Sequence, residues 1–257
     1  MGSSTQNGVG VSELAGKTAL VTGATAGIGR AVAARLAEHG AEVVVHGRDA
    51  RRGAELVSAI AERGSRARFV AADLANAEDV ERLAAEAGEV DILVNNAGVY
   101  EFTSTPGTST GSFDRHLAIN TRAPFQLVAA LAPGMVKRGH GAIVNVSSTA
   151  ATSVAPVGAA YGASKAALET LTRYWATEFG GAGIRVNGVA SGPVRTPGTE
   201  PLLAAYADTM DQVNARGRIG DPEEIADVVL FLVEGRSSYV NGTVVAVHGG
   251  ERSSLPG

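Results

Sequence analysis

The chain has 257 residues, of which 45% are hydrophobic and 19% are charged, and its formal net charge is −4. This composition is typical of a globular protein, and the absence of a clustered basic face argues against nucleic-acid binding. The sequence has no cysteine, which excludes disulfides and thiolate ligands, and its five histidines lack the spacing of a metal site. There is no signal-peptide pattern before Lys17 and no apolar run of about 18 residues, so we expect a cytoplasmic protein without a membrane span.

Short apolar runs alternate with amphipathic segments along the chain. Seven apolar runs have the length and composition of buried strands, at residues 18–22, 43–45, 68–71, 92–94, 143–146, 185–189 and 244–247. Between them, helices are predicted within residues 28–36, 50–63, 80–87, 112–138, 168–179 and 225–232. In the long segment 112–138, we expect Pro124 to bend the helix and Pro133 to lie close to its end.

This alternation predicts the fold class. Short buried strands that alternate with helices indicate βαβ units and a parallel sheet covered on both faces. Right-handed crossovers then give an α/β, doubly wound parallel sheet (the Rossmann fold) of about seven strands, with helices on both faces. We expect residues 1–13 to form a disordered arm and residues 14–257 to form a single domain. Ligands of such a sheet bind at the carboxyl ends of its strands.

A glycine-rich turn follows the first predicted strand, in the order Thr22-Gly23-Ala24-Thr25-Ala26-Gly27-Ile28-Gly29. Glycines let the backbone turn tightly and approach a pyrophosphate. The following helix presents free N–H groups and its positive dipole end to the phosphates. The turn therefore predicts a dinucleotide cofactor, with an ordinary strand–helix turn as the alternative.

Tyr161 and Lys165 are the candidate catalytic pair. On a helix, side chains four residues apart lie on one face, and an ammonium beside a phenol lowers the phenol's pKa from about 10. A tyrosine tuned in this way exchanges protons near neutral pH. Ser148 lies thirteen residues before Tyr161, at the end of a predicted strand. A serine hydrolase is the rival interpretation, but the segment lacks a G-x-S-x-G elbow and no histidine is recognisably placed as its base.

Together these motifs resemble the short-chain dehydrogenase/reductase family, from about residue 17 to residue 250. The resemblance implies that Ser148 polarises a substrate carbonyl while Tyr161 exchanges a proton with its oxygen. It implies that Lys165 keeps the phenol acidic and holds the nicotinamide ribose. Asn120 matches the family's fourth catalytic residue, which binds a water that connects to the lysine; an Asn that simply faces solvent is the alternative.

The resemblance also implies a set of cofactor contacts at the ends of the predicted strands. They are Gly23, Thr25, Gly27, Ile28, Gly29, Arg48, Asp73, Leu74, Asn96, Ala97, Gly98, Tyr161, Lys165, Gly192, Val194 and Thr196. Residues 95–98 match the family's N-N-A-G motif, in which an Asn steadies the central sheet. Helix capping is an equally good role for Asp73, and Ser191 stands where the family usually has proline.

The end of the second predicted strand bears on the choice between NADP(H) and NAD(H). A carboxylate at the position of Gly47 would bind the ribose 2′-hydroxyl of NAD, and Gly47 cannot do so. Arg48 can make a bidentate contact with a 2′-phosphate, and we expect Gly47 to leave room for that phosphate. We therefore expect NADP(H). NAD(H) stays possible, because the Asp49 carboxylate either reaches the ribose or caps the next helix.

The predicted function is an NADP(H)-dependent ketoreductase that transfers hydride between nicotinamide and a carbonyl or alcohol carbon. A 3-oxoacyl reductase is one option, with Lys137 and Arg138 as contacts for an acyl carrier protein. An NAD-dependent alcohol dehydrogenase of the same family is an alternative. A cofactor-sensing protein without catalysis is another, although such a protein has no need of the Ser/Tyr/Lys set.

Substrate contacts are expected from three loops with few charges, which suits a neutral, partly apolar ketone or alcohol. They include Tyr100, Phe102, Val154, Pro156, Tyr206 and Met210. Apolar residues beyond a single stripe, including Phe125, Leu131, Tyr174 and Trp175, mark two helices that family members commonly pair across two-fold axes. We therefore expect a homotetramer, with a dimer as the alternative.

Overall fold

The computed structural model describes residues 13–101, 103–154, 157–200 and 214–250. Its strands are β1 (Thr18–Val21), β2 (Glu42–Gly47), β3 (Ala67–Ala71), β4 (Ile92–Asn95), β5 (Gly141–Ser148), β6 (Ile184–Ser191) and β7 (Val244–Val247). All seven predicted strands are present, and β2, β5 and β6 are each at least three residues longer than predicted. The strands pair in the order β3-β2-β1-β4-β5-β6-β7, and every pairing is parallel.

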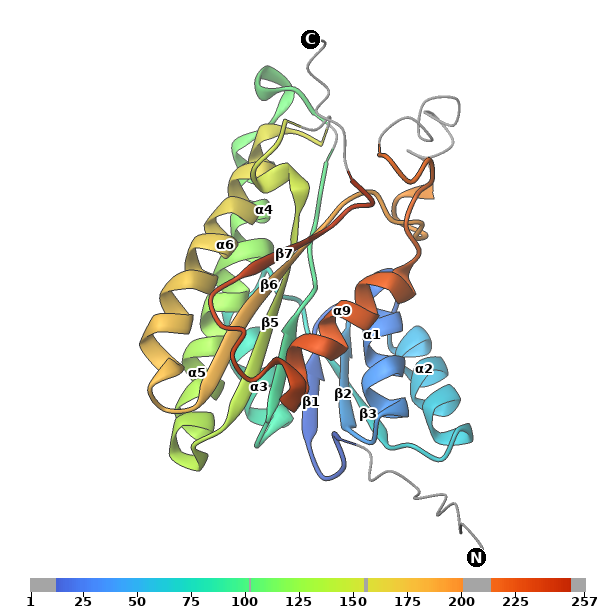
Figure 1. Cartoon of the computed structure of the whole chain (residues 1–257). Helices are drawn as coiled ribbons and strands as arrows, with labels where there is room; N and C mark the ends of the chain where they lie inside the picture. Colours follow the sequence, from blue (N-terminus) through green and yellow to red (C-terminus); the bar gives the residue numbers. More distant parts are fainter. Residues whose placement is uncertain (1–12, 102, 155–156, 201–213, 251–257) are drawn as a thin grey trace, which may run out of the picture.

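The helices form two layers around this sheet (Figure 1). The main helices are α1 (Gly27–Glu38), α2 (Ala50–Glu62), α3 (Ala77–Ala87), α4 (Thr110–Leu117), α5 (Ala123–Arg138), α6 (Ala159–Gly180) and α9 (Pro222–Val233). Apolar side chains of α1, α2 and α9 pack in one core, and those of α3, α5 and α6 pack in a second core. The two cores lie on opposite faces of the sheet, which confirms the doubly wound α/β fold.

The long segment 112–138 is not one continuous α-helix. Between α4 and α5 the chain makes a π turn, η2 (Ala118–Arg122), which ends two residues before Pro124. Pro124 has no N–H to donate to the carbonyl of Asn120, one α-helical turn earlier, so the regular hydrogen-bond pattern is lost at this point. The predicted bend is therefore a widened turn that carries Asn120, while Pro133 lies inside α5, which continues to Arg138.

Strand order reverses between β1 and β4, since β2 and β3 lie on one side of β1 and β5 to β7 lie beyond β4. The carboxyl ends of the strands at this switch point form the edge where a doubly wound sheet binds its ligands. Within the described part of the chain, no helix combines the length and the apolar character needed to cross a lipid bilayer.

Candidate active site

The glycine turn between β1 and α1 packs tightly against the turn after β4. Gly23 and Gly27 adopt positive φ angles of 64° and 52°, which glycine tolerates best. A Cβ atom on Gly23 would lie 2.9 Å from the Cα of Ala97, and one on Gly29 would lie 2.3 Å from the amide nitrogen of Asn96. The turn therefore needs these glycines to let the two loops approach each other.

The N-terminus of α1 is open. Its N-cap residue is Ala26, which offers no side-chain acceptor. Among the described residues, none accepts a hydrogen bond from the backbone N–H groups of Thr25, Ala26, Gly27 or Ile28. By contrast, Asp49 and Asn76 accept hydrogen bonds at the N-termini of α2 and α3. Unbonded N–H groups at the positive end of a helix fit the pyrophosphate of a dinucleotide.

The side chains of His46, in β2, and Asn96, directly after β4, hold this turn in place. His46, at 2% exposure, accepts a hydrogen bond at Nδ1 from the Gly23 N–H (3.1 Å), so its Nε2–H donates to the Ala72 carbonyl (3.2 Å). Burial lowers the pKa of His46 to about 4, which keeps the ring neutral. Asn96 donates to the carbonyls of Thr22 (2.8 Å) and Gly23 (3.2 Å). The Asn96 side chain thus fixes the position of the glycine turn.

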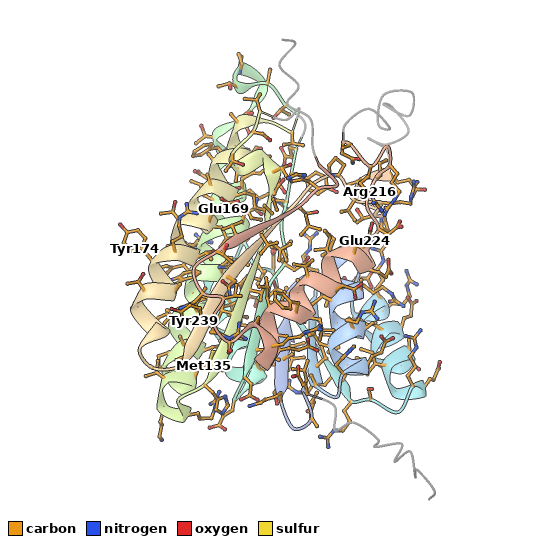
Figure 2. The ribbon with its side chains drawn as sticks, viewed as in Figure 1. Met135, Glu169, Tyr174, Arg216, Glu224 and Tyr239 are labelled. Carbon is orange, nitrogen blue, oxygen red and sulfur yellow. The ribbon has the colours of Figure 1, made fainter. Side chains whose placement is uncertain are left out.

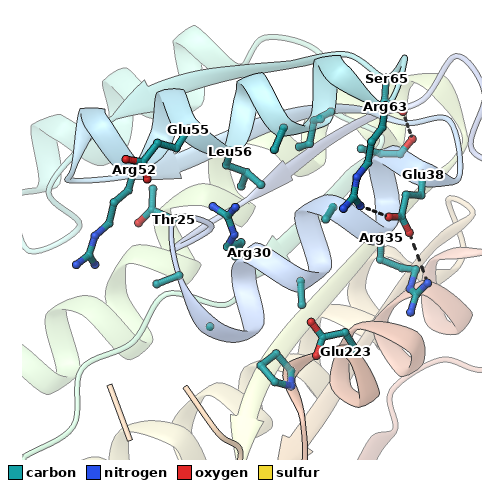
Figure 3. A pocket seen from close by; sticks show the side chains of 18 of the residues that line it. Thr25, Arg30, Arg35, Glu38, Arg52, Glu55, Leu56, Arg63, Ser65 and Glu223 are labelled. Carbon is teal, nitrogen blue, oxygen red and sulfur yellow. Dashed lines mark hydrogen bonds and ion pairs between the residues drawn. The ribbon is translucent and has the colours of Figure 1, made fainter. Parts of the chain in front are cut away.

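A groove of about 620 Å³ runs along α1 and α2, from Thr25 and Gly27 toward Ser65 (Figure 3). Charged side chains along it pair with one another, as Arg63 does with Glu38 at 2.6 Å. Only the end of the groove at the glycine turn adjoins the predicted cofactor site. None of the predicted catalytic residues lines it.

The residues after β2 bear on whether Asp49 binds the ribose of NAD(H) or Arg48 binds the 2′-phosphate of NADP(H). The Asp49 carboxylate accepts a hydrogen bond from the Arg52 N–H (3.1 Å) and so caps α2. Arg51 pairs with Glu55 at 2.6 Å, and Arg52 pairs with Asp49 at 3.4 Å. Arg48 is exposed and makes no ion pair or hydrogen bond with another described side chain, so its guanidinium is available to a phosphate.

Gly47 packs directly against the glycine turn. A Cβ atom on Gly47 would lie 2.4 Å from the methyl carbon of Thr25, because the Thr25 side chain already fills that space. Glycine is needed here for packing against the glycine turn. Any selection of a 2′-phosphate at this point therefore comes from Arg48 and the turn itself.

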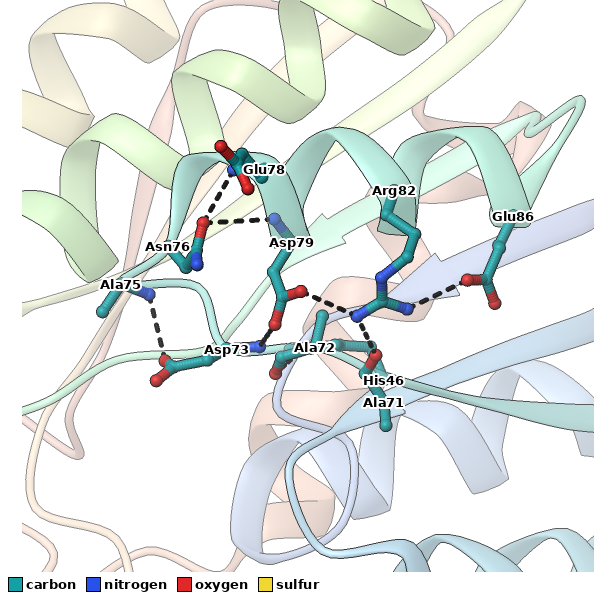
Figure 4. Close-up of polar contacts among 10 residues, drawn as sticks. All are labelled: His46, Ala71, Ala72, Asp73, Ala75, Asn76, Glu78, Asp79, Arg82 and Glu86. Carbon is teal, nitrogen blue, oxygen red and sulfur yellow. Dashed lines mark hydrogen bonds and ion pairs between the residues drawn. The ribbon is translucent and has the colours of Figure 1, made fainter.

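The loop after β3 holds Asp73 and Leu74 at the same edge. Asp73 is exposed, its N–H donates to the Asp79 carboxylate (2.8 Å), and its own carboxylate accepts from the Ala75 N–H (3.1 Å) (Figure 4). Asn76 caps α3, so the capping role considered for Asp73 is wrong. Leu74 is buried and faces the core that contains α3.

Ser148, Tyr161 and Lys165 come together where β5 ends beside the first turns of α6. The Lys165 Nζ lies 5.8 Å from the centre of the Tyr161 ring and donates to the Val146 carbonyl at 2.8 Å. The Ser148 hydroxyl oxygen accepts from the Ala150 N–H at 3.2 Å, and the same hydroxyl interacts with the Tyr161 phenol. A proton donor, a hydroxyl and a cation are therefore assembled around one point.

The charge states in this site differ from the expectation that Lys165 lowers the pKa of Tyr161. The Tyr161 side chain is partly exposed, but its hydroxyl is shielded from solvent. This desolvation raises the pKa of Tyr161 to about 12, although the hydrogen bond with Ser148 lowers that pKa. Burial lowers the pKa of Lys165 to about 8. The physical reason is desolvation of both groups, since the Lys165 ammonium is hydrogen-bonded to the Val146 carbonyl and lies 5.8 Å from the centre of the Tyr161 ring. Tyr161 is therefore a protonated donor at neutral pH.

Asn120 does not face solvent. It is fully buried in η2, its Oδ1 accepts from the Val99 N–H (2.8 Å), and its Nδ2 donates to the Val99 carbonyl (2.9 Å) and the Ser164 hydroxyl (2.9 Å). A Cβ atom on Gly98 would lie 3.3 Å from both Asn120 Oδ1 and Lys165 Nζ. The structure thus places Asn120 and Lys165 on the same side of Gly98, and the predicted water between them stays a prediction.

The loop after β6 closes against the glycine turn. Gly192 donates its N–H to the Val247 carbonyl (3.0 Å), and Val194 is buried beside Gly220. Thr196 packs against Gly27, where a Cβ atom would lie 3.0 Å from the Thr196 methyl carbon. Ser191, at the position where proline was expected, donates to the Gly192 carbonyl at 2.9 Å. The cofactor segments predicted from separate parts of the sequence therefore meet at one edge.

The family model described as enoyl-(acyl carrier protein) reductase matches residues 23–251 of the chain. A solved structure described as a short-chain dehydrogenase/reductase family protein is 50% identical, with a TM-score of 0.87 over 93% of this chain and 98% of that one. This chain is a short-chain dehydrogenase/reductase. The predicted family and the predicted oxidoreductase class are confirmed.

Two further relatives of this short-chain dehydrogenase/reductase differ in their substrates. A 3-oxoacyl-(acyl-carrier-protein) reductase from Agrobacterium tumefaciens, solved with NADP bound, is 32% identical, with a TM-score of 0.89 over 93% of this chain and 96% of that one. Gluconate 5-dehydrogenase from Gluconobacter oxydans is 36% identical over 94% of this chain and 97% of its own length. The bound NADP agrees with the predicted cofactor.

Only part of the predicted substrate surface of this dehydrogenase/reductase is described. Tyr100 lies with its ring edge-on to Tyr161, at 6.1 Å between centres, and Val154 is exposed. Phe102, Pro156, Tyr206 and Met210 lie outside the described residues, as does nearly all of the predicted arm at 1–13. The buried ring of His116 packs 6.5 Å from Tyr161.

Sequence reasoning missed several residues that position the site of this dehydrogenase/reductase. They are His46, His116, Ser147, Ser164 and Glu169, which are all buried. A polar residue inside an otherwise apolar strand or helix face was the available signal, as for His46 after three valines. That signal does not say which distant backbone group the side chain binds.

Proposed function

We propose that this chain is an NADP(H)-dependent ketoreductase, with Tyr161 as the proton donor to the carbonyl oxygen. The supporting observation is the meeting of Ser148, Tyr161 and Lys165 beside an α1 N-terminus whose N–H groups are open. When bound, the nicotinamide donates hydride to a carbonyl carbon or accepts it from an alcohol. The chain's residues bind the substrate oxygen and exchange a proton with it.

Each catalytic side chain has a defined task in ketone reduction. Ser148 donates its O–H to the carbonyl oxygen and so stabilises the negative charge that develops there. Tyr161 gives its phenolic proton to the same oxygen, and the Lys165 ammonium stabilises the phenolate that is left. With the pKa of Tyr161 raised to about 12, the phenol is protonated at pH 7, which is the state that donates a proton to a carbonyl oxygen.

We propose a neutral, partly apolar ketone as the substrate, including the 3-oxoacyl class. The described loop contacts carry few charges, and Tyr100 lies against Tyr161. A panel of an aryl ketone, a 3-oxoacyl thioester, a keto sugar acid and an enoyl thioester tests this with NADPH absorbance as the readout. Turnover of either of the first two supports the proposal. Turnover of the keto sugar acid or the enoyl thioester alone contradicts it, and NADPH binding without turnover indicates a cofactor sensor.

Tyr161→Phe tests the mechanism. The variant should lose about 10²–10⁴-fold in kcat on an active ketone, because the alkoxide has no proton donor, and should keep its Kd for NADPH. The matched control is Tyr174→Phe, since Tyr174 lies exposed on the same helix (71%). Wild-type kcat in Tyr161→Phe would rule out the assigned proton donor.

A further inference from the structure

One face of α6 carries an acid that the mechanism above does not use. Tyr161, Lys165 and Glu169 follow one another at intervals of four residues, so they lie one turn apart on the same side of the helix. Lys165 is 3% exposed and Glu169 is 5% exposed. Glu169 therefore places a carboxylate inside the protein, one helical turn from the catalytic lysine (Figure 2 labels it on α6).

The last residues of β5 hold both charged groups. The Ser147 hydroxyl donates to a carboxylate oxygen of Glu169 at 2.8 Å. On one side of Ser147, the Val146 carbonyl accepts from the Lys165 ammonium at 2.8 Å. On its other side is Ser148. Glu169 thus connects α6 to the same strand end that presents the catalytic serine and anchors the catalytic lysine.

A buried ammonium needs compensation. Burial lowers the pKa of Lys165 to about 8, and the opposing influence is the charge of Glu169, which raises it. Without a nearby anion, a buried lysine gives up its proton more readily, and a neutral amine cannot stabilise the phenolate of Tyr161.

Other ionisable groups near this pair face the phenol. Among the described residues, Tyr100 and His116 contact the Tyr161 ring, from the loop after β4 and from α4. Neither β5 nor the 3-10 turn after it, η3 (Thr149–Ala151), carries an ionisable side chain.

On α4, Asp114 and Arg115 are exposed, and the basic residues of β6, η2 and α5 point elsewhere. The Arg185 guanidinium of β6 donates to the carbonyls of Leu232 and Glu234, and Arg122 of η2 donates to the Ala75 carbonyl. In α5, Arg138 donates to the Val90 carbonyl, and Lys137 is next to it at the far end of that helix. Within the described part of the chain, Glu169 is therefore the acid that acts on Lys165.

We propose that Glu169 is a positioning residue that keeps the Lys165 ammonium charged during ketone reduction. The inference rests on the proposed ketoreductase function. The Glu169 carboxylate takes no part in the proton transfer itself; it acts through Lys165. Its loss therefore changes the pH range in which the enzyme works.

The test is the pH profile of kcat/KM for ketone reduction between pH 6 and 10, in wild type, Glu169→Gln and Ser147→Ala. Glutamine can still accept the Ser147 hydrogen bond but has no charge. We expect the alkaline decline of activity to move to lower pH by about one unit in Glu169→Gln. Activity near pH 6 should stay within about threefold of wild type, since Lys165 is charged there in both proteins. Tyr161, with its pKa at about 12, titrates outside this range.

Ser147→Ala is the matched control, because it removes the hydrogen bond and keeps the charge. Its alkaline decline should stay at the wild-type pH, as should that of Glu169→Asp. Where Glu169→Gln does not fold, Glu169→Met with Ser147→Ala removes both polar partners together and should show the same shift.

A uniform loss of activity at every pH, or an unmoved alkaline decline in the charge-removing variants, would overturn the role of Glu169. An equal shift in Ser147→Ala would also overturn it, since the hydrogen bond would then be responsible. Failure of the underlying function gives a different result, which is no ketone reduction by the wild type at any pH.

Discussion

At the scale of single residues, the polar groups of the site are held by backbone atoms of neighbouring segments. Lys165 is tied to the Val146 carbonyl, Asn120 to both backbone groups of Val99, and His46 to the Gly23 N–H. Buried polar groups without partners are costly, so each of these contacts also stabilises the local fold. Orientation of the side chains therefore precedes any binding of substrate.

Arg48→Leu tests the cofactor preference. Loss of a bidentate contact between guanidinium and phosphate costs about 1.5–3 kcal/mol, so the Kd for NADPH should rise roughly ten- to hundredfold while that for NADH stays nearly unchanged. Arg51→Leu is the control, because Arg51 is already paired with Glu55. Wild-type protein that binds NADH as tightly as NADPH in parallel titrations would refute the NADP(H) preference.

His46→Gln should change how stability depends on pH. In the folded protein the pKa of His46 is lowered to about 4, against about 6.5 when unfolded, so the unfolded state binds the extra proton as pH falls through this window. The stabilising contribution is complete above pH 6.5 and is lost toward pH 4. Between pH 7 and pH 5, His46 should lower the free energy of unfolding of the wild type by about 2 kcal/mol. Urea unfolding should show a shallower pH dependence in His46→Gln, and parallel curves for the two proteins would contradict the buried neutral ring.

At the scale of elements, the N-termini of α1, α2 and α3 differ in one respect. Asp49 and Asn76 cap the second and third of these helices, while Ala26 leaves the first open. A side-chain cap would occupy the same N–H groups that a phosphate needs. An open terminus therefore makes the fold less stable but leaves the N–H groups available to bind a phosphate.

Ala26→Asp should therefore have opposite effects on stability and binding. An aspartate at the N-cap should stabilise the fold by about 0.5–2 kcal/mol, because it accepts from the open N–H groups. The same carboxylate repels the cofactor phosphates and should raise the Kd for NADPH at least tenfold. Ala26→Asn caps without a charge and should weaken binding less. Thermal unfolding and fluorescence titration measure the two effects, and an unchanged Kd in Ala26→Asp would show that the phosphates lie elsewhere.

At the scale of the whole molecule, α5 and α6 carry apolar surface that the chain does not cover with its described residues. Phe125 is 51% exposed and Tyr174 is 71% exposed, and Tyr174 points outward from α6 (Figure 2). Leu131 and Trp175, which were expected on the same surface, are buried in the chain's own core. The Phe125 ring contacts Trp175 at 6.3 Å between centres, so the surface continues directly from that core.

We predict that this surface joins subunits in a homotetramer, with a dimer as the alternative. Light scattering at micromolar protein should give a mass of two or four times 26.0 kDa. Phe125→Glu with Tyr174→Glu should reduce that mass, because four desolvated charges at a two-fold interface repel one another. Tyr239→Glu, which changes a fully exposed aromatic residue outside α5 and α6, is the control. A monomeric wild type contradicts the prediction.

The sequence alone predicted the order of strands and helices and the residues at the carboxyl ends of the strands. Strand and helix periodicity is local, and a parallel sheet places all its strand ends at known edges, so Gly23, Asn96, Ser148 and Thr196 were placed correctly without coordinates. The placement of Tyr161 and Lys165 on one helix also followed from their spacing.

Only the tertiary structure decided properties that depend on contacts between distant segments. The pKa of Tyr161 rises because its surroundings remove solvent, and the space beside Gly47 is filled by Thr25 from another turn. Glu169, on α6, accepts a hydrogen bond from Ser147, which lies 22 positions earlier in β5. Desolvation and packing are set by the whole arrangement of the chain, which residue spacing does not encode.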